Sequence, residues 1–111
     1  MNYQKLIYSG NLTRDPEMNV VNDSQLTKFA VANNRKVKGK EYKCFLECVA
    51  WGKTAEMIAD YFKKGDAIFL DGILQFDQWE KDGVKHSKHW LKVENFQFVG
   101  KKGDRNADAP F

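Results

Sequence analysis

Two large aromatic side chains and a carboxylate occur at alternate positions of a short stretch of the sequence, FLECVAWGK at residues 45–53. If this stretch is a β-strand, alternation places Phe45, Glu47 and Trp51 on one face and small or apolar residues on the other. An unpaired carboxylate is costly inside a core, so the face that carries Glu47 is expected to be exposed. Flat aromatic rings on an exposed face can stack on nucleobases with little regard for base sequence. The stretch predicts a stacking surface, although core or subunit packing explains any single aromatic residue equally well.

Basic residues are concentrated immediately before this strand, in a stretch expected to be a loop. Between residues 35 and 43 one acid, Glu41, accompanies five cations: Arg35, Lys36, Lys38, Lys40 and Lys43. Lys53 continues the positive charge beyond Trp51. Cations along the same path as stacking aromatics would neutralise the phosphates of a nucleic acid. Taken alone, such a run is more often a solvated charged segment.

Two further tryptophans follow in the second half of the chain. Trp79 precedes the turn sequence EKDG, which places it near a hairpin tip and makes it a third stacking candidate. Trp90 shares a strand face with Lys88 and Lys92, and either nucleic-acid contact or a subunit interface explains it.

Length and composition limit the fold to one compact domain. The chain has 111 residues, of which 42% are hydrophobic and 14% aromatic, enough for a single core. The formal charge of +3 permits a polyanionic partner without requiring one. No apolar run is long enough to span a membrane, and the N-terminus lacks the features of a signal peptide. We therefore expect a cytoplasmic protein without a membrane partner.

The two cysteines do not indicate a metal site or a cofactor. Cys44 and Cys48 are too far apart along a strand for a disulfide or for chelation of one ion, so both are expected to be core thiols. His86 and His89 could complete a Cys2His2 set, but the spacing on a strand is wrong for zinc. The sequence predicts no metal and no cofactor.

Hydrophobic alternation and turn residues predict five strands and one short helix. A loop at TRDPE, where Pro16 stops the ladder, follows the first strand. The strands are expected at residues 3–12, 26–33, 42–51, 67–76 and 86–99. The stretch TAEMIADYFKKG separates the third and fourth strands and has helical periodicity. Three strands, a helix and two strands is the order of the OB fold, a five-stranded Greek-key barrel, although other small β-rich folds share it.

Local signals within the helix and the fourth strand are more specific. Met57, Ile58, Tyr61 and Phe62 are expected on one helical face. Lys63 and Lys64 are expected in the last turn of the helix, with Gly65 as its C-terminal cap. Gly72, in the middle of AIFLDGILQF, predicts a β-bulge or a sharp barrel bend.

Four segments in register resemble one family. They are GNLTRDPE at 10–17, AVAN at 30–33, WGKTAEMIADYFKKGDAIFLDG at 51–72 and DAPF at 108–111. Together they resemble the bacterial and phage single-stranded DNA-binding proteins, from the first strand to the last residue. The resemblance implies an all-β OB fold that forms a homodimer or homotetramer. It also implies that the protein coats single-stranded DNA during replication, repair or recombination.

The resemblance also implies roles for individual residues. Phe45, Trp51 and Trp79 match base-stacking positions, and Lys5 and Lys53 match basic positions of the groove. A fourth stacking aromatic would fall near Val37 and is absent. Glu47, Gln75 and Asp77 stand where many members carry arginine or another residue that favours DNA. These departures suggest weaker binding per subunit or a different path for the strand.

The sequence divides into an OB domain at residues 1–100 and a short tail at 101–111, which is expected to be flexible. At its end, Asp108, Pro110 and Phe111 combine an acid, an aromatic ring and a terminal carboxylate. That chemistry suits a basic pocket with an apolar floor. In the family such a tip recruits replication and repair proteins, whereas the simpler interpretation is a frayed terminus.

Two other function classes remain open at this point. An OB-fold interaction module of a primosome-like assembly would use the same barrel mainly to hold proteins, with weak DNA affinity. A small nuclease would need clustered carboxylates to bind metal. The local supply is Asp71, Asp77, Glu80 and Asp82, which lie along one strand and turn without an accompanying His or Lys constellation. The sequence therefore predicts a binding protein and not an enzyme.

Overall fold

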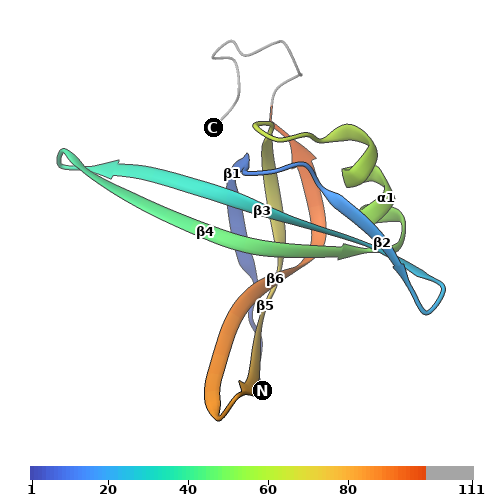
Figure 1. Cartoon of the computed structure of the whole chain (residues 1–111). Helices are drawn as coiled ribbons and strands as arrows, with labels where there is room; N and C mark the ends of the chain where they lie inside the picture. The colour runs from blue at the N-terminus through green and yellow to red at the C-terminus, as the bar shows by residue number, and fades with distance from the viewer. Residues whose placement is uncertain (100–111) are drawn as a thin grey trace.

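The computed structural model describes residues 1–99, and this part of the chain folds into six strands and one helix (Figure 1). The elements are β1 (Leu6–Leu12), β2 (Glu17–Val21), β3 (Ser24–Val37), β4 (Lys40–Trp51), α1 (Gly52–Tyr61), β5 (Ala67–Lys81) and β6 (Val84–Phe98). The predicted tail at 101–111 and its tip residues lie outside the described residues. Within residues 1–99, no helix has the length and apolar character that crossing a membrane would require.

Five of the strands close into a barrel. The sheet order is β1-β5-β6-β4-β3-β2, and β1 also pairs with β3, which closes five strands into a ring and leaves β2 attached to β3 outside it. β4 and β6 pair in parallel, with Glu47 opposite Trp90, and the other neighbours pair antiparallel. With α1 between β4 and β5, this is the topology of the OB fold. The prediction of a five-stranded Greek-key barrel with one short helix is confirmed.

The core fills the barrel with alternate residues of each strand and one face of the helix. Its buried members are Leu12, Phe29, Val31, Cys48, Ala50, Ala55, Ile58, Phe62, Ile68, Leu70, Leu91 and Val93. Burial of a side chain such as Phe29 or Ile58 contributes about 1.5 to 3 kcal/mol. The buried hydroxyl of Thr27 donates a hydrogen bond of 2.8 Å to the carbonyl of Ala55, which ties α1 to β3.

Two of the quoted sequence motifs serve the barrel directly. A side chain at Gly10 would collide with the backbone of Ala32, where β1 and β3 close the barrel. In the same GNLTRDPE motif, the carboxylate of Asp15 accepts a hydrogen bond of 2.8 Å from the backbone N–H of Lys64. Gly72 lies at the bulge between β5 and β6, where a side chain would meet the carbonyl of Lys92. The bulge predicted at Gly72 is confirmed.

Two long hairpins project from the barrel as arms (Figure 1). We call residues 33–44 the β3–β4 arm and residues 75–90 the β5–β6 arm. Each arm ends in a two-residue turn with positive φ, at Lys38–Gly39 and at Asp82–Gly83. Such turns match the twist of the flanking strands, so the pairing continues to the tip.

The expected strand limits need correction at several places, and the strand expected at 67–76 extends to Lys81. The first strand begins at Leu6, not at residue 3, and the second extends from Ser24 to Val37. The sequence interpretation missed β2, a strand of only five residues that follows Pro16 directly and whose residues are all exposed. The expected basic loop at 35–43 is wrong: these residues pair as the two strands of an arm up to Val37 and Lys40.

Two other local expectations are also wrong. The helix ends at Tyr61 and Phe62 is extended, so Lys63 and Lys64 lie beyond the last turn and Gly65 is not its cap. Of the expected apolar face, Ile58 and Phe62 are buried, whereas Met57 and Tyr61 are exposed. Cys44 is exposed because it lies on the arm, and Cys48 is the core thiol.

Candidate nucleic-acid interface

The outer face of β4 carries the aromatic residues that the sequence singled out. Phe45 is 66% exposed and Trp51 is 38% exposed, while Cys48 and Ala50 on the opposite face are fully buried. The expected alternation is confirmed. Phe45 and Trp51 are six residues apart, which corresponds to about 20 Å along a strand. The two rings therefore mark two separate contact points on one surface.

Glu47, between these rings, is not an unpaired carboxylate. Its Oε2 lies 3.5 Å from Nη1 of Arg14, and its Oε1 lies 3.3 Å from Nζ of Lys88. The first cation comes from the loop after β1 and the second from β6, so the ion pairs join three parts of the surface. Exposed ion pairs contribute little to stability, at most about 1 kcal/mol each. Glu47 holds two cations in the middle of the aromatic face.

Trp90 completes an aromatic surface with Trp51. Their ring centroids are 5.9 Å apart with an interplanar angle of 47°. The indole Nε1–H of Trp90 donates a hydrogen bond of 3.0 Å to Oδ2 of Asp77 on β5, which fixes the orientation of the ring. The ammonium of Lys92 lies 5.9 Å from the centroid of Trp51. Trp90 and Lys92, both on β6, thus lie close to the ring of Trp51 on β4.

A hollow opens beside these two rings, and we call it the tryptophan hollow. Its volume is about 210 Å³. It is lined by Leu26, Lys28, Glu47, Val49, Trp51, Asp77, Lys88 and Trp90. Val49 and the buried Leu26 supply an apolar lining, while lysines from β3 and β6 supply positive charge. Apolar walls with a few placed polar groups are typical of ligand sites.

Trp79 lies farther out on the β5–β6 arm. It is 46% exposed, and its ring stacks on His86 with centroids 5.6 Å apart and planes 19° apart. The register pairs Asp77 with Lys88 and Trp79 with His86, so these side chains share the face that carries the tryptophan hollow. The imidazole thus lies against one face of the Trp79 ring, while 46% of the residue stays exposed.

The arm register separates the basic residues before β4. Lys43 is on the same strand face as Phe45, and Lys36, opposite Glu41, faces the same side. Arg35 is opposite Tyr42 on the other face, with its guanidinium carbon 5.6 Å from that ring. Lys38 lies in the turn. The structure therefore brings part of the predicted basic set to the aromatic face and directs Arg35 away from it.

Lys5, a predicted groove residue, already has two acidic partners. Its Nζ lies 3.7 Å from Oδ1 of Asp71 and 3.7 Å from Oε1 of Glu94. Its charge is therefore compensated within the protein. Just before it, the side-chain amide of Gln4 exchanges hydrogen bonds of 3.0 and 2.9 Å with the backbone of Leu74. These contacts hold the residues before β1 against β5.

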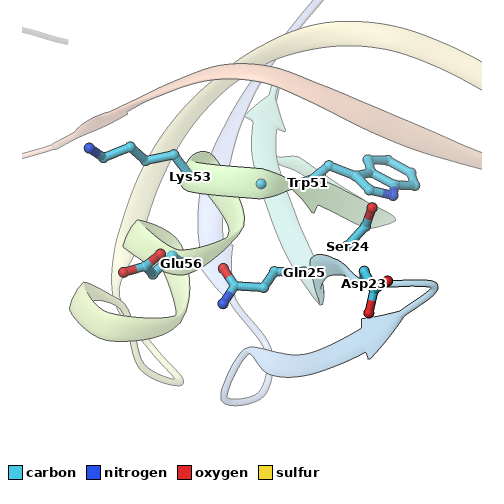
Figure 2. Close-up of a pocket in the computed structure, with 7 residues that line it drawn as sticks. Asp23, Ser24, Gln25, Trp51, Lys53 and Glu56 are labelled. Atoms are coloured by element: carbon cyan, nitrogen blue, oxygen red, sulfur yellow. The ribbon is translucent and has the colours of Figure 1, made fainter.

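Lys53 belongs to a second hollow at the start of α1 (Figure 2). Its volume is about 650 Å³. It is lined by Asp23, Ser24, Gln25, Trp51, Gly52, Lys53 and Glu56. Figure 2 shows the Lys53 side chain extending away from the Trp51 ring. Lys53 is therefore near Trp51 in sequence but does not share its stacking surface.

Two ionisable groups with raised pKa values, the partly buried Tyr8 and the buried Cys48, are structural. The hydroxyl oxygen of Tyr8 lies 3.0 Å from the carbonyl oxygen of Cys44 and 3.3 Å from that of Val31, so its single hydrogen is shared between these two acceptors, and burial raises its pKa. Burial likewise raises the pKa of the Cys48 thiol to about 12, so this thiol stays protonated at neutral pH. Within residues 1–99, no group of three or more His, Cys, Asp or Glu side chains is placed to hold a metal ion.

Comparison with known proteins agrees with this geometry. The model of the single-strand binding protein family matches residues 3–99. The chain belongs to the single-strand binding protein family. The match covers every strand of the barrel and both arms, so the family assignment rests on the whole described fold.

Individual relatives come from distant bacteria. A single-stranded DNA-binding protein of Wolinella succinogenes is 37% identical over 91% of this chain and 67% of its own length. Single-stranded DNA-binding protein 2 of Streptococcus agalactiae serotype V is 36% identical, over 93% of this chain and 82% of the relative. Single-stranded DNA-binding protein 1 of a Synechocystis species is 38% identical, over 90% and 85% respectively. The chain spans about two thirds of the length of the first of these and of a Helicobacter hepaticus relative.

Sequence reasoning missed two residues of the tryptophan hollow and the face around it. Arg14 and Lys28 were not singled out, because neither belongs to a charge run or follows an aromatic residue. Arg14 reaches Glu47 across the sheet, and Lys28 lines the tryptophan hollow from β3. Trp90, for which two explanations were open, faces the hollow. Strand register, rather than any local motif, brings these three residues together.

Proposed function

We propose that this protein binds single-stranded DNA, with bases stacked on the aromatic face of β4, β5 and β6 and phosphates neutralised by nearby lysines. The exposed Trp51 ring beside Trp90, in a barrel of the single-strand binding protein family, is the observation that carries the proposal. Stacking on aromatic rings is available to every base. The relatives' names, single-stranded DNA-binding protein, support the same assignment.

The binding residues in this proposal are of two kinds. Phe45, Trp51 and Trp79 stack on bases, and the cations Lys36, Lys38, Lys43 and Lys53 follow the phosphates. Lys5 and Arg35 contribute only after leaving their present partners. No catalytic step is proposed, since stacking and charge neutralisation account for the residues of this face.

A single subunit is expected to bind with modest strength. Three stacked bases supply roughly 3 to 9 kcal/mol before ordering costs, which spans millimolar to submicromolar affinity. Several subunits on one strand raise the effective concentration of each site for the DNA. We therefore propose a homodimer or homotetramer that binds cooperatively or wraps the strand.

The proposed cellular role follows from the family and from the sequence. The protein would coat and protect single strands during DNA replication, repair or recombination in a bacterial or phage-infected cytoplasm. The tip residues Asp108, Pro110 and Phe111 would recruit replication and repair proteins. Their acid, ring and terminal carboxylate support this through the basic, apolar pocket that such a tip suits.

A titration of intrinsic tryptophan fluorescence tests the DNA-binding proposal. The full chain is mixed with a single strand of mixed sequence and, separately, with a duplex of equal length, at two salt concentrations. We expect strong quenching by the single strand only, weaker at the higher salt, because stacked bases quench indoles and phosphate contacts release counterions. Absence of quenching and of binding to the single strand would favour the interaction-module alternative.

The Trp51→Ala variant locates the surface. We expect its affinity for the single strand to fall by about 1 to 3 kcal/mol, because one stacking ring is lost. Tyr61→Ala is the matched control, since Tyr61 is 60% exposed on α1 and packs edge-on against Phe98, away from the hollow. Equal affinity for Trp51→Ala and Tyr61→Ala, with both proteins folded by circular dichroism, would place the DNA elsewhere.

A further inference from the structure

Asp77 has an unusual position for a carboxylate in a groove proposed to hold DNA. It lines the tryptophan hollow next to the rings of Trp51 and Trp90. Its Oδ2 accepts the 3.0 Å hydrogen bond from the indole of Trp90, which fixes the carboxylate as well as the ring. Oδ1 takes part in no hydrogen bond or ion pair recorded among residues 1–99. The hollow therefore presents one fixed acceptor atom beside a stacking surface.

The other carboxylate of the hollow is occupied. Both oxygens of Glu47 are engaged, one by Arg14 at 3.5 Å and one by Lys88 at 3.3 Å. The remaining polar groups of the lining, Lys28 and Lys88, are donors only. Among the side-chain oxygens of the described residues that line the hollow, Oδ1 of Asp77 is thus the one with neither a hydrogen bond nor an ion pair.

An acceptor discriminates between bases at their amino groups. Cytosine and adenine carry an exocyclic NH₂ donor, where thymine carries the O4 acceptor. In a single strand thymine also exposes its N3–H, but this donor lies between the carbonyl oxygens O2 and O4. A carboxylate accepts a hydrogen bond from the amino group and repels the carbonyl oxygen. The volume of about 210 Å³ suits one base, so the discrimination acts on one nucleotide per subunit.

We propose that the tryptophan hollow is a base subsite in which Asp77 selects amino-bearing bases over thymine. The base lies against Trp51 and Trp90, and its amino group donates to Oδ1 of Asp77. This inference rests on the proposed single-strand binding and adds a base preference to it, without reading a sequence. Because the site is partly exposed, we expect cytosine to bind only about 3- to 10-fold more tightly than thymine.

Asp77→Asn should reverse the preference rather than only weaken it. The amide oxygen of asparagine can accept the Trp90 hydrogen bond, which turns its NH₂ group toward the base. A donor at that place favours the O4 acceptor of thymine and disfavours the amino group of cytosine. The variant keeps the shape of the hollow and changes only the hydrogen-bonding character and charge of one side chain.

The experiment uses two ligands that differ at the base edge alone. Homo-oligomers of thymidine and of 5-methyldeoxycytidine, each about twelve nucleotides long, carry the same C5 methyl group. They differ at position 4, O4 against NH₂, and at N3, which carries a hydrogen only in thymine. Affinities are measured by calorimetry with the full chain, at mildly alkaline pH and fixed salt. The ratio of the two dissociation constants is compared among the natural protein, Asp77→Asn and Glu80→Gln. Glu80 lies on the opposite face of the same strand, so Glu80→Gln removes the same charge without altering the hollow.

Three results decide the matter. We expect the natural protein and Glu80→Gln to prefer 5-methylcytosine and Asp77→Asn to prefer thymine. Equal affinities for both ligands, or a ratio that Asp77→Asn leaves unchanged, would overturn the base subsite while leaving single-strand binding intact. Failure of the natural protein to bind either oligomer, or the mixed-sequence strand, would instead overturn the proposed function itself.

Discussion

The two arms share a construction but differ in chemistry. Both are long hairpins that leave the barrel and end in a two-residue turn with positive φ. Residues 35–43 of the β3–β4 arm carry five cations and one acid, a formal charge of +4. Residues 76–89 of the β5–β6 arm carry three lysines and three acids, which cancel, together with Phe76, Trp79 and two histidines. The fold thus presents one basic arm and one aromatic arm next to the face that carries Phe45, Trp51 and the tryptophan hollow.

This difference divides the expected binding energy into two parts. Contacts from a basic arm act on phosphates, and they weaken steeply as salt rises. Contacts from an aromatic arm act on bases, and they depend little on salt but more on which base is bound. Substitutions in the two arms should therefore be distinguishable by the quantity that they change, and not only by the size of the loss.

The largest effect is expected on the aromatic arm. Trp79→Ala should weaken single-strand binding by about 1 to 3 kcal/mol at low and high salt alike, because the protein loses one aromatic ring on which a base stacks and loses no charge. Affinity measured over a series of salt concentrations checks this. Phe76→Ala is the matched control, since Phe76 packs on His89 on the opposite face of the same arm. A Phe76→Ala loss equal to that of Trp79→Ala would mean that DNA does not follow the groove face.

A smaller loss with a different signature is expected on the basic arm. The double variant Lys36→Ala, Lys43→Ala should lower the slope of log affinity against log salt by about 1.4, because two phosphate contacts each release counterions. The preference between 5-methylcytosine and thymine should not change. Arg35→Ala, on the far face beside Tyr42, should alter the slope by less than either lysine. An equal effect of Arg35→Ala would show that the strand wraps around both faces of the arm.

The barrel could be predicted from sequence because its signals are local. Alternation in FLECVAWGK, the helical period after Gly52 and the bulge glycine at 72 each reflect the conformation of a few residues. The OB order then follows from the order of elements along the chain. The errors in the strands occurred at β2, which is short and wholly exposed, and in the arms, where both faces are solvated. Residues 35–43 of the β3–β4 arm are mostly charged and have no apolar period, so they resembled a loop.

The groove could be predicted only in part, because its contacts join distant segments. Phe45, Trp51 and Trp79 were found from residue type and from the family resemblance. The bond between Trp90 and Asp77, and the pairing of Arg14 with Glu47, depend on how β4, β5 and β6 align. Thirteen residues separate the first pair, and a shift of one residue in register would move one partner to the opposite face. Register is a property of the whole barrel, so no local motif revealed these contacts.

The smallest effect is expected at Glu47, which lies between aromatic rings and pairs with two cations. Glu47 lies between the aromatic rings and neutralises Arg14 and Lys88, so it keeps two cations from the phosphates. Glu47→Gln removes one negative charge and releases both cations, and we expect binding to become about two- to fivefold tighter at low salt. The gain should vanish at high salt, since it comes from phosphate contacts.

Glu80→Gln separates this local effect from a change in net charge, because it adds the same charge away from the groove face. Equal gains in both variants would mean that only the overall charge of the protein matters. Weaker binding by Glu47→Gln would mean that the ion pairs hold Arg14 and Lys88 where the DNA needs them. The expected result is a gain specific to Glu47→Gln. It would show that Glu47 keeps Arg14 and Lys88 from contacting phosphates, and that this carboxylate limits the affinity of the aromatic face for single-stranded DNA.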